Sequence, residues 1–134
     1  MPEVTLIIPA RPVPKARPRM GKYGNVYTPK DTQQYENLVK MVASQCFDKP
    51  LDCPVELYIK FKLPRPRKLI WKKKPMPEMP HACRPDISNY IKSIEDGLNG
   101  IAFYDDKQIW KLTAEKVYHA GDDKPETIVK VRWE

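Results

Sequence analysis

The chain has 134 residues, a formal net charge of +7 and a hydrophobic content of 41%. A chain of this length buries roughly two-thirds of its extended surface, so intrinsic disorder is unexpected despite 15 prolines. No window approaches the roughly 18 apolar residues of a membrane span, and the N-terminus lacks the apolar core of a signal peptide. Three cysteines without a CxxC pair favour a reducing compartment. We therefore predict one cytoplasmic domain, residues 1–134.

The positive charge is unevenly distributed along the chain. Two stretches without any acid, one between Glu3 and Asp31 and one between Glu56 and Glu78, hold most of the cations, whereas five acids fall within residues 86–106. Basic segments around an acidic centre are typical of a protein that holds a polyanion and presents it to a metal ion. Charged loops can equally be solvated surface, and charge alone does not decide between these interpretations.

The N-terminal segment is predicted to form a strand, an extended stretch and a hairpin. Apolar residues alternate over residues 4–8, which indicates a strand that ends at Pro9. Prolines exclude a helix over residues 10–20. Residues 21–27 are expected to form a turn or short hairpin around Gly24 and Asn25.

A first helix is predicted from Thr28 to about Cys46. Thr28 can cap it, and Pro29 suits the first turn. Five apolar side chains share one helical face: Tyr35, Leu38, Val39, Val42 and Cys46. Residues 55–62 then alternate between apolar and polar side chains, which predicts the most regular strand of the chain.

A long basic segment separates that strand from a second helix. Residues 63–85 contain six prolines and little apolar periodicity, which favours a mobile binding loop. Residues 86–98 are expected to be helical, with Gly97 and the pair at 99–100 ending the helix. Its apolar face carries Ile87, Tyr90, Ile91, Ile94 and Leu98, and its polar face carries Ser88, Lys92, Glu95, Asp96 and Asn99.

Two further strands complete the predicted fold. Residues 108–118 are expected to place Trp110, Leu112 and Ala114 on one side, and residues 127–133 alternate as a closing strand. This order of elements predicts an α+β fold in a single compact domain, with a mixed or mostly antiparallel sheet and two main helices.

The residues that carry chemistry fall in the stretch RPDISNYIKSIEDGLNGIAFYDDKQI, residues 84–109. Asp86 precedes the second helix, and the Asp105-Asp106 pair opens a strand. If that strand runs back beside the start of the helix, these carboxylates converge into a site suited to Mg²⁺ or Mn²⁺. Lys92 could then stabilise the charge that develops on a phosphoryl group. The alternative is that Asp86 only caps the helix and the pair lies in a solvated turn.

This stretch closely resembles the signature of the RusA family of Holliday-junction resolvases, approximately RPDxDNxxKxxxDALNGxxxxDDxQI. The segments PKARPR, residues 14–19, and YTPKDTQQYE, residues 27–36, are also similar to that family. The matching positions are Arg84, Pro85, Asp86, Asn89, Lys92, Asp96, Leu98, Asn99, Gly100, Asp105, Asp106 and Gln108. The resemblance covers most of the chain, and its central motif is long and specifically spaced.

The sequence departs from the family pattern at one important position. Ser88 stands where the pattern carries a second aspartate. The resemblance implies that Asp86 and Asp106, with Asp105 as the alternative or additional ligand, hold the metal, and that Asp86, Lys92 and Asp106 are catalytic. Ser88 cannot supply the missing charge, so reduced metal affinity and activity are expected.

The resemblance further implies a homodimeric, Mg²⁺-dependent endodeoxyribonuclease that resolves four-way junctions during DNA recombination and repair, with Mn²⁺ as a possible substitute. Two symmetric nicks require two like sites, which a two-fold dimer supplies. Family members often occur in phages and prophages, which implies a phage role. Two alternatives stay open: a branched-DNA-binding protein that no longer cuts, as Ser88 would indicate, and a metal nuclease that acts on flaps or forks.

The basic segments are expected to hold the DNA backbone, which adds affinity without sequence information. The predicted contacts are Lys15, Arg17, Arg19, Arg65, Arg67, Lys72, Lys73 and Lys74. Trp71 could stack on an unpaired base or anchor the loop to the core, and both interpretations stay open. Glu95 is interpreted as a surface residue of the helix.

Overall fold

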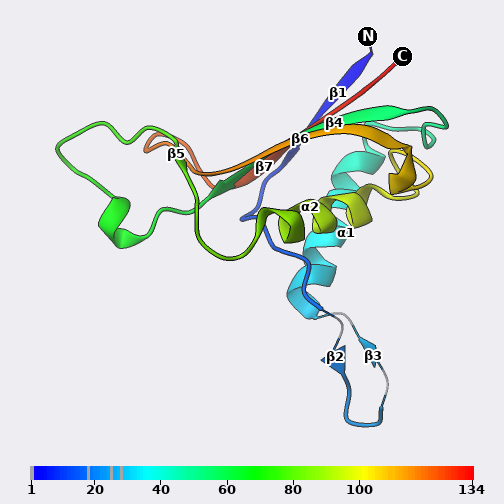
Figure 1. The fold of residues 1–134 in the computed structure, drawn as a ribbon, viewed down its shortest axis with the longest axis horizontal. Coiled ribbons are helices and arrows are strands. Elements are labelled where there is room, and N and C mark those ends of the chain that lie inside the picture. Colours follow the sequence, from blue (N-terminus) through cyan, green and yellow to red (C-terminus); the bar gives the residue numbers. More distant parts are fainter. Residues whose placement is uncertain (1, 18, 25, 28) are drawn as a thin grey trace.

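Five strands form one mixed sheet in the order β1-β7-β4-β6-β5 (Figure 1). The computed structural model describes residues 2–17, 19–24, 26–27 and 29–134. The strands are β1 (Glu3–Ile8), β4 (Val55–Leu63), β5 (Met79–Pro80), β6 (Ile109–Tyr118) and β7 (Glu126–Trp133). β4 runs parallel to β6, and the other neighbours are antiparallel. The predicted α+β fold with a mixed sheet is confirmed.

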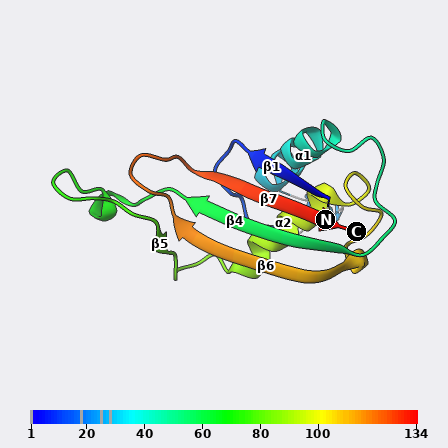
Figure 2. The same cartoon turned by 90° about the horizontal axis from the view of Figure 1, so that it is seen from above.

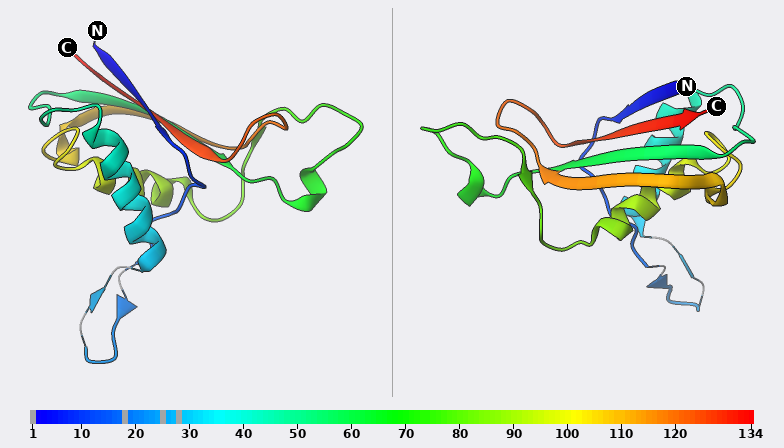
Figure 3. Two further views of the ribbon diagram at one scale, coloured as in Figure 1. Left: turned by 180° about the vertical axis from the view of Figure 1, so that it is seen from behind. Right: turned by 45° about the horizontal axis from the view of Figure 1, so that its top comes forward.

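Both long helices, α1 (Lys30–Ser44) and α2 (Ile87–Leu98), lie against the same face of this sheet (Figures 1 and 3). Viewed from above, the four long strands run side by side with the helices behind them (Figure 2). Alternate residues of β1, β4 and β7 point toward the helices, because side chains alternate across a strand. The largest fully buried side chains include Phe61, Phe103, Leu6, Ile8, Ile59, Ile94 and Leu98. Burial of these apolar side chains fixes how α2 lies against the sheet.

The intervening residues of β4 are polar and form ion pairs on the opposite face of the sheet. The Lys60 ammonium lies 2.8 Å from a carboxylate oxygen of Glu78, and Lys111 of β6 lies 3.7 Å from Glu56. The Tyr58 hydroxyl donates to Glu115 at 2.5 Å. Opposite charges on neighbouring strands contribute to sheet stability, and they make this face polar.

A small hairpin projects beyond the start of α1, at the end of that helix farther from the five-stranded sheet (Figure 1). Its strands, β2 (Arg19–Met20) and β3 (Val26–Tyr27), pair antiparallel, and Gly24 adopts a left-handed φ of 83° in the turn. Such a φ favours glycine because it has no Cβ. The predicted hairpin is confirmed, although Asn25 lies outside the described residues.

Helix α1 is shorter than predicted. It begins at Lys30, with Pro29 at the N-cap position and no side-chain cap, while the predicted cap, Thr28, lies outside the described residues. Tyr35 and Val39 face the core as expected. The placement of Cys46 on that face is wrong, because the helix ends at Ser44 and Cys46 is exposed.

Gly97 was predicted to help end α2, but it lies inside the helix. A Cβ at this position would lie 2.6 Å from Cγ1 of Val39, which is far below a normal van der Waals contact. Glycine therefore allows α1 and α2 to pack closely. The chain turns after the helix, where Gly100 has a left-handed φ of 81°.

Trp110 is not on the same side of β6 as Leu112 and Ala114. The pairing of β6 with β4 is irregular between Val55 and Glu56, so Trp110 has no partner in the register. Its side chain is 65% exposed. An extra residue of this kind shifts the alternation of a strand, which a strict period of two cannot predict. Within the described residues, no helix is long and apolar enough to cross a membrane.

Candidate active site

Asp86 occupies the N-cap position of α2. Its carboxylate makes no capping hydrogen bond, although the backbone carbonyl accepts one from the amide of Asn89 at 3.1 Å. The residue is exposed and lines an open cavity of about 540 Å³. The interpretation of Asp86 as a simple helix cap therefore lacks its expected contact, and the carboxylate is available to another group.

Lys92 lies between two aspartates on the polar face of α2. Its ammonium is 3.5 Å from Oδ1 of Asp96, one turn further along the helix, and 3.7 Å from Oδ2 of Asp106. The negative charge of Asp96, with a further contribution from Asp106, raises the pKa of Lys92 against the opposing effect of partial burial. Lys92 stays protonated at neutral pH, and half of its side chain is exposed to a ligand.

The two neighbouring aspartates have different surroundings. Asp105 is the N-cap of the short helix η2 (Asp106–Gln108), where its Oδ2 accepts from the amide of Lys107 at 2.9 Å. Gln108 completes this capping box by accepting from the Asp105 amide, and its own amide group donates to the carbonyls of Leu51 and Cys53. These contacts fix the turn and direct Asp106, rather than Asp105, toward α2.

The basic segment 63–85 is tied to the sheet at its base. The guanidinium of Arg65 is buried and donates to the carbonyls of Leu69, Pro77 and His119 at 2.9–3.3 Å. The amide of Gly121 donates to Met76 at 2.7 Å, and a side chain at 121 would overlap Met76. Because its donors are turned to carbonyls, we remove Arg65 from the expected phosphate contacts and assign it to holding the loop.

Trp71 is packed within this loop. Its indole donates to the carbonyl of Lys68 at 3.2 Å and lies between Arg65 and Lys74, whose charged groups are 5.2 and 4.2 Å from the ring centroid. Cation–π contacts on the ring favour the anchoring interpretation over base stacking. The anchored indole orders the loop next to its three consecutive lysines.

The other predicted phosphate contacts fall into three groups. Arg17, Arg67 and the loop lysines (Lys72, Lys73 and Lys74) are exposed. Lys15 is paired instead, at 2.8 Å from Glu36 and 3.1 Å from Asp96, so it links the N-terminal segment to both helices. Arg19 lies in β2, and its side chain is outside the described part of the structure.

Comparison with known proteins decides the family. A family model described as endodeoxyribonuclease RusA matches residues 9–132. The chain belongs to the RusA endodeoxyribonuclease family. It is also 28% identical over 130 residues to the uncharacterized protein YqaN of Bacillus subtilis strain 168, with 90% of this chain and 89% of that protein covered. RusA membership implies a nuclease that acts on branched DNA, which is the activity class expected from the sequence.

The RusA motif brings Lys92 beside Asp96 and Asp106 but gathers no group of acids among the described residues. Among the described residues, no three acidic, histidine or cysteine side chains lie close enough together to hold a metal ion. Asp86, Asp105 and Asp106, the ligands proposed from the sequence, therefore form no such group. Ser88 stands on α2 between Asp86 and Lys92, it is exposed, and its hydroxyl makes no hydrogen bond in the described part of the chain.

Glu95 is closer to this RusA site than the sequence analysis assumed. Its side chain is partly buried, and burial, together with the charge of Asp106, raises the pKa of Glu95 against the lowering effect of Lys92. Glu95 is therefore a partly exposed residue of the helix that also lies near the charges of Lys92 and Asp106. Spacing gives the only signal: Glu95 lies three residues after Lys92, which places both on neighbouring positions of the helix.

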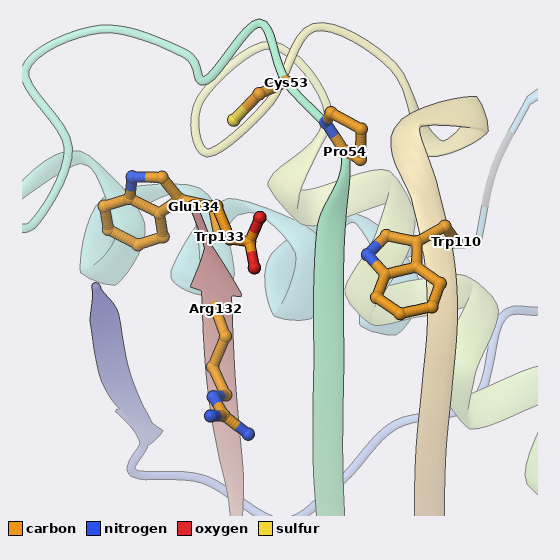
Figure 4. A pocket seen from close by; sticks show the side chains of 6 residues that line it. All are labelled: Cys53, Pro54, Trp110, Arg132, Trp133 and Glu134. Atoms are coloured by element: carbon orange, nitrogen blue, oxygen red, sulfur yellow. The ribbon is translucent and has the colours of Figure 1, made fainter. Parts of the chain in front are cut away.

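A separate cavity of about 370 Å³ contains none of the predicted site residues. It is lined by Cys53, Pro54, Trp110, Arg132, Trp133 and Glu134 (Figure 4). Figure 4 shows the two indoles on either side of Pro54, where β4 begins. Its one acidic lining residue is Glu134 and its lining includes no lysine, so this mostly apolar pocket lacks the pair of carboxylates and the lysine that phosphodiester chemistry needs.

Proposed function

We propose that the protein is a Mg²⁺-dependent, structure-specific endonuclease that resolves four-way DNA junctions by paired symmetric nicks. One observation carries this proposal: the ammonium of Lys92 lies 3.5 Å from a carboxylate oxygen of Asp96 and 3.7 Å from one of Asp106, on the helix that follows the uncapped carboxylate of Asp86. The arrangement places a protonated lysine beside two carboxylates, those of Asp96 and Asp106, for which the described residues supply no backbone hydrogen bond. Family membership supports the same reaction class.

The side chains at this site fit a hard divalent cation that keeps several water ligands. Asp86 and Asp106 would supply carboxylate oxygens, and Mg²⁺ commonly binds proteins through one or two carboxylates plus substrate phosphates. The Asp105 carboxylate is held by the backbone of η2, so Asp106 is the proposed ligand of the pair. When bound, the ion would lower the pKa of a water molecule and neutralise phosphate charge.

Lys92 would stabilise the negative charge that grows on the phosphoryl oxygens as the bond breaks. Its raised pKa keeps it protonated, and its half-exposed side chain can reach a bound phosphate. Asp96 lies on the same helix at i+4 and orients the ammonium. A fixed cation of this kind acts most strongly in the transition state, because it needs little reorganisation.

The exposed cations would hold the DNA backbone beside this site. We propose that Arg17, Arg67 and the loop lysines contact phosphates, since Arg65 and Trp71 anchor the loop that carries the lysines. Such contacts add affinity and salt dependence without reading sequence. We also propose a homodimer, because two symmetric nicks in a junction need two like sites.

The test is a cleavage and binding assay with a labelled four-way junction, a flap and a linear duplex, with and without Mg²⁺ or Mn²⁺. The proposal predicts preferential, metal-dependent cutting of the junction into paired nicked products, and light scattering should give the mass of a dimer. Ser88 favours a second candidate, a protein that binds branched DNA without cutting it. Junction binding without cleavage at every metal concentration would favour that candidate, and equal cutting of flap and junction would favour a broader nuclease.

A further inference from the structure

Lys116 of β6 holds the segment that leads into α2. Its ammonium donates to the carbonyls of Cys83 and Pro85, both at 2.6 Å. The backbone carbonyl of the same residue accepts from the amide of His81 at 3.0 Å. One residue of the sheet therefore fixes the segment 81–85 at three points, immediately before Asp86.

These contacts determine where the backbone of Asp86 lies. The carbonyl of Pro85 belongs to the same planar peptide unit as the amide nitrogen of Asp86, so fixing one orients the other. The Asp86 carboxylate has no capping bond of its own, and its position therefore depends on the backbone that precedes it. Asp86 and Lys116 also line the same cavity of about 540 Å³.

The position of Lys116 in the sheet is unusual for a charged residue. It pairs with Phe61 of β4, which is fully buried, and β6 carries Leu112 and Ala114 on this same helix-facing side. Lys116 is partly buried there, and burying an ammonium group is costly unless hydrogen bonds satisfy its charge. Two short bonds to carbonyls satisfy that requirement, which indicates that the ammonium is placed to make them.

The ring of His81 also attaches the start of this segment to β6. Its ring lies 4.7 Å from that of Tyr118, and burial, with the charge of Lys116, lowers the pKa of His81. The imidazole is therefore neutral beside the ammonium at neutral pH. Acceptors from the main chain, rather than a carboxylate, balance Lys116, and no salt bridge joins it to an acid among the described residues.

We propose that Lys116 is a positioning residue that holds the 83–85 turn so that the Asp86 carboxylate faces the metal and substrate. This inference rests on the proposed function in one respect, since it takes Asp86 as a metal ligand. Lys116 acts through Asp86 and does not itself touch the reacting atoms. Groups that orient metal ligands typically contribute 10–100-fold to affinity or activity, which is roughly the size of effect expected here.

The experiment compares Lys116→Met, which removes the donors, with Lys116→Arg, which retains charge and donors. Lys111→Met is the matched control, because Lys111 lies on the same strand but on the opposite face, paired with Glu56. Three quantities are measured: hydrogen exchange of the amides at 81–89, the Mn²⁺ concentration that half-broadens the Asp86 amide signal, and the rate of junction cleavage. Unfolding midpoints report any general loss of stability.

Lys116→Met should speed exchange at 81–89 while leaving β7 unchanged, raise the Mn²⁺ midpoint several-fold, and slow cleavage about 10–100-fold. Metal-free junction binding should change little, Lys116→Arg should restore most of the loss, and Lys111→Met should match the unmodified chain. Unchanged exchange would overturn the inference, as would faster exchange with an unchanged Mn²⁺ midpoint. If no version binds Mn²⁺ or cuts, the proposed function fails, whereas exchange alone still decides whether Lys116 holds the turn.

Discussion

The ammonium of Lys92 lies 3.7 Å from a carboxylate oxygen of Asp106, although fourteen positions separate the two residues along the chain. The capping box of Asp105 and Gln108 turns η2 toward α2 and produces this contact. The acid that precedes β6 and the lysine of α2 thus lie side by side.

Replacing Lys92 with alanine should separate chemistry from binding. The variant should lower the cleavage rate about 100–1,000-fold, because a preorganised positive charge acts mainly in the transition state, while the Kd for the junction stays within a few-fold. Single-turnover cleavage and gel-shift titration measure the two quantities. Lys40→Ala on α1, which removes a bond to the carbonyl of Asp96, is the control for indirect effects on α2. A Lys92→Ala protein that cuts at the normal rate would remove Lys92 from the mechanism.

Asparagine substitutions should distinguish the two neighbouring aspartates. Asp106→Asn should eliminate metal-dependent cleavage yet retain the fold and preserve or improve DNA binding, because one negative charge facing phosphate is lost. Asp105→Asn should act mainly on the η2 turn, because its Oδ2 accepts from Lys107, and should reduce cleavage less. Cleavage rates and thermal unfolding of both variants provide the measurement. The opposite ranking would show that Asp105 is the metal ligand.

The loop lysines should govern affinity rather than the chemical step. Changing Lys72, Lys73 and Lys74 to glutamine should weaken junction binding and reduce the slope of log Kd against log salt by up to about 0.9 for each lost phosphate contact. The slope is measured by fluorescence anisotropy at several salt concentrations. The control is a triple variant in which three lysines outside the loop, Lys49, Lys111 and Lys130, are changed to glutamine. Equal slopes for the two triple variants would show that the loop lysines do not contact DNA.

The ion pair between Lys62 and Asp123 should make stability depend on acid pH. The ammonium lies 2.6 Å from Oδ2 of Asp123, and this hydrogen bond lowers the pKa of Asp123 below its usual 3.8. The contribution of the ion pair to folding stability is therefore fully present above the pKa of Asp123 in the unfolded chain. It is lost as pH falls through the lower pKa of Asp123 in the folded protein. Asp123→Asn should cost about 0.5–1 kcal/mol at pH 7, the size for a partly exposed pair.

Urea unfolding from pH 7 down to pH 3 measures this difference. The gap between Asp123→Asn and the unmodified chain should narrow toward the acid end of that range, whereas the exposed neighbour Asp122→Asn should show no gap at either end. A gap that stays constant with pH would show that the pair does not cause it.

The periodic parts of the chain could be predicted from sequence, and the exceptions arise from tertiary packing. The alternation in β4 and the apolar face of α2 predicted the buried residues because each pattern matches its element directly. Glycine is common at helix ends, so Gly97 was predicted to end α2. Its actual role is to leave room for Val39 of α1, which the sequence pattern cannot predict. Trp110 breaks the alternation of β6 because the irregular pairing depends on the neighbouring strand.

The candidate site was predictable as a motif but not as a set of contacts. The spacing of the motif predicted that Lys92 and the later acids would meet, and Lys92 does lie near Asp106, whereas the pairing of Lys15 with Glu36 and Asp96 depends on two helices meeting. The burial of Arg65 likewise depends on carbonyls that come from distant turns. Composition alone could not distinguish these bound cations from the exposed lysines.

Position 88 provides the most direct measurement of the central claim, that a metal held on this face of α2 drives cleavage. The rate of four-way junction cleavage is measured against Mg²⁺ concentration for the unmodified chain, Ser88→Asp and the uncharged control Ser88→Asn. Because affinity for a hard cation rises with ligand charge, Ser88→Asp should cut much faster and need less Mg²⁺, while the other two cut slowly. A full rate in the unmodified chain, with a metal dependence that Ser88→Asp does not alter, would contradict the account.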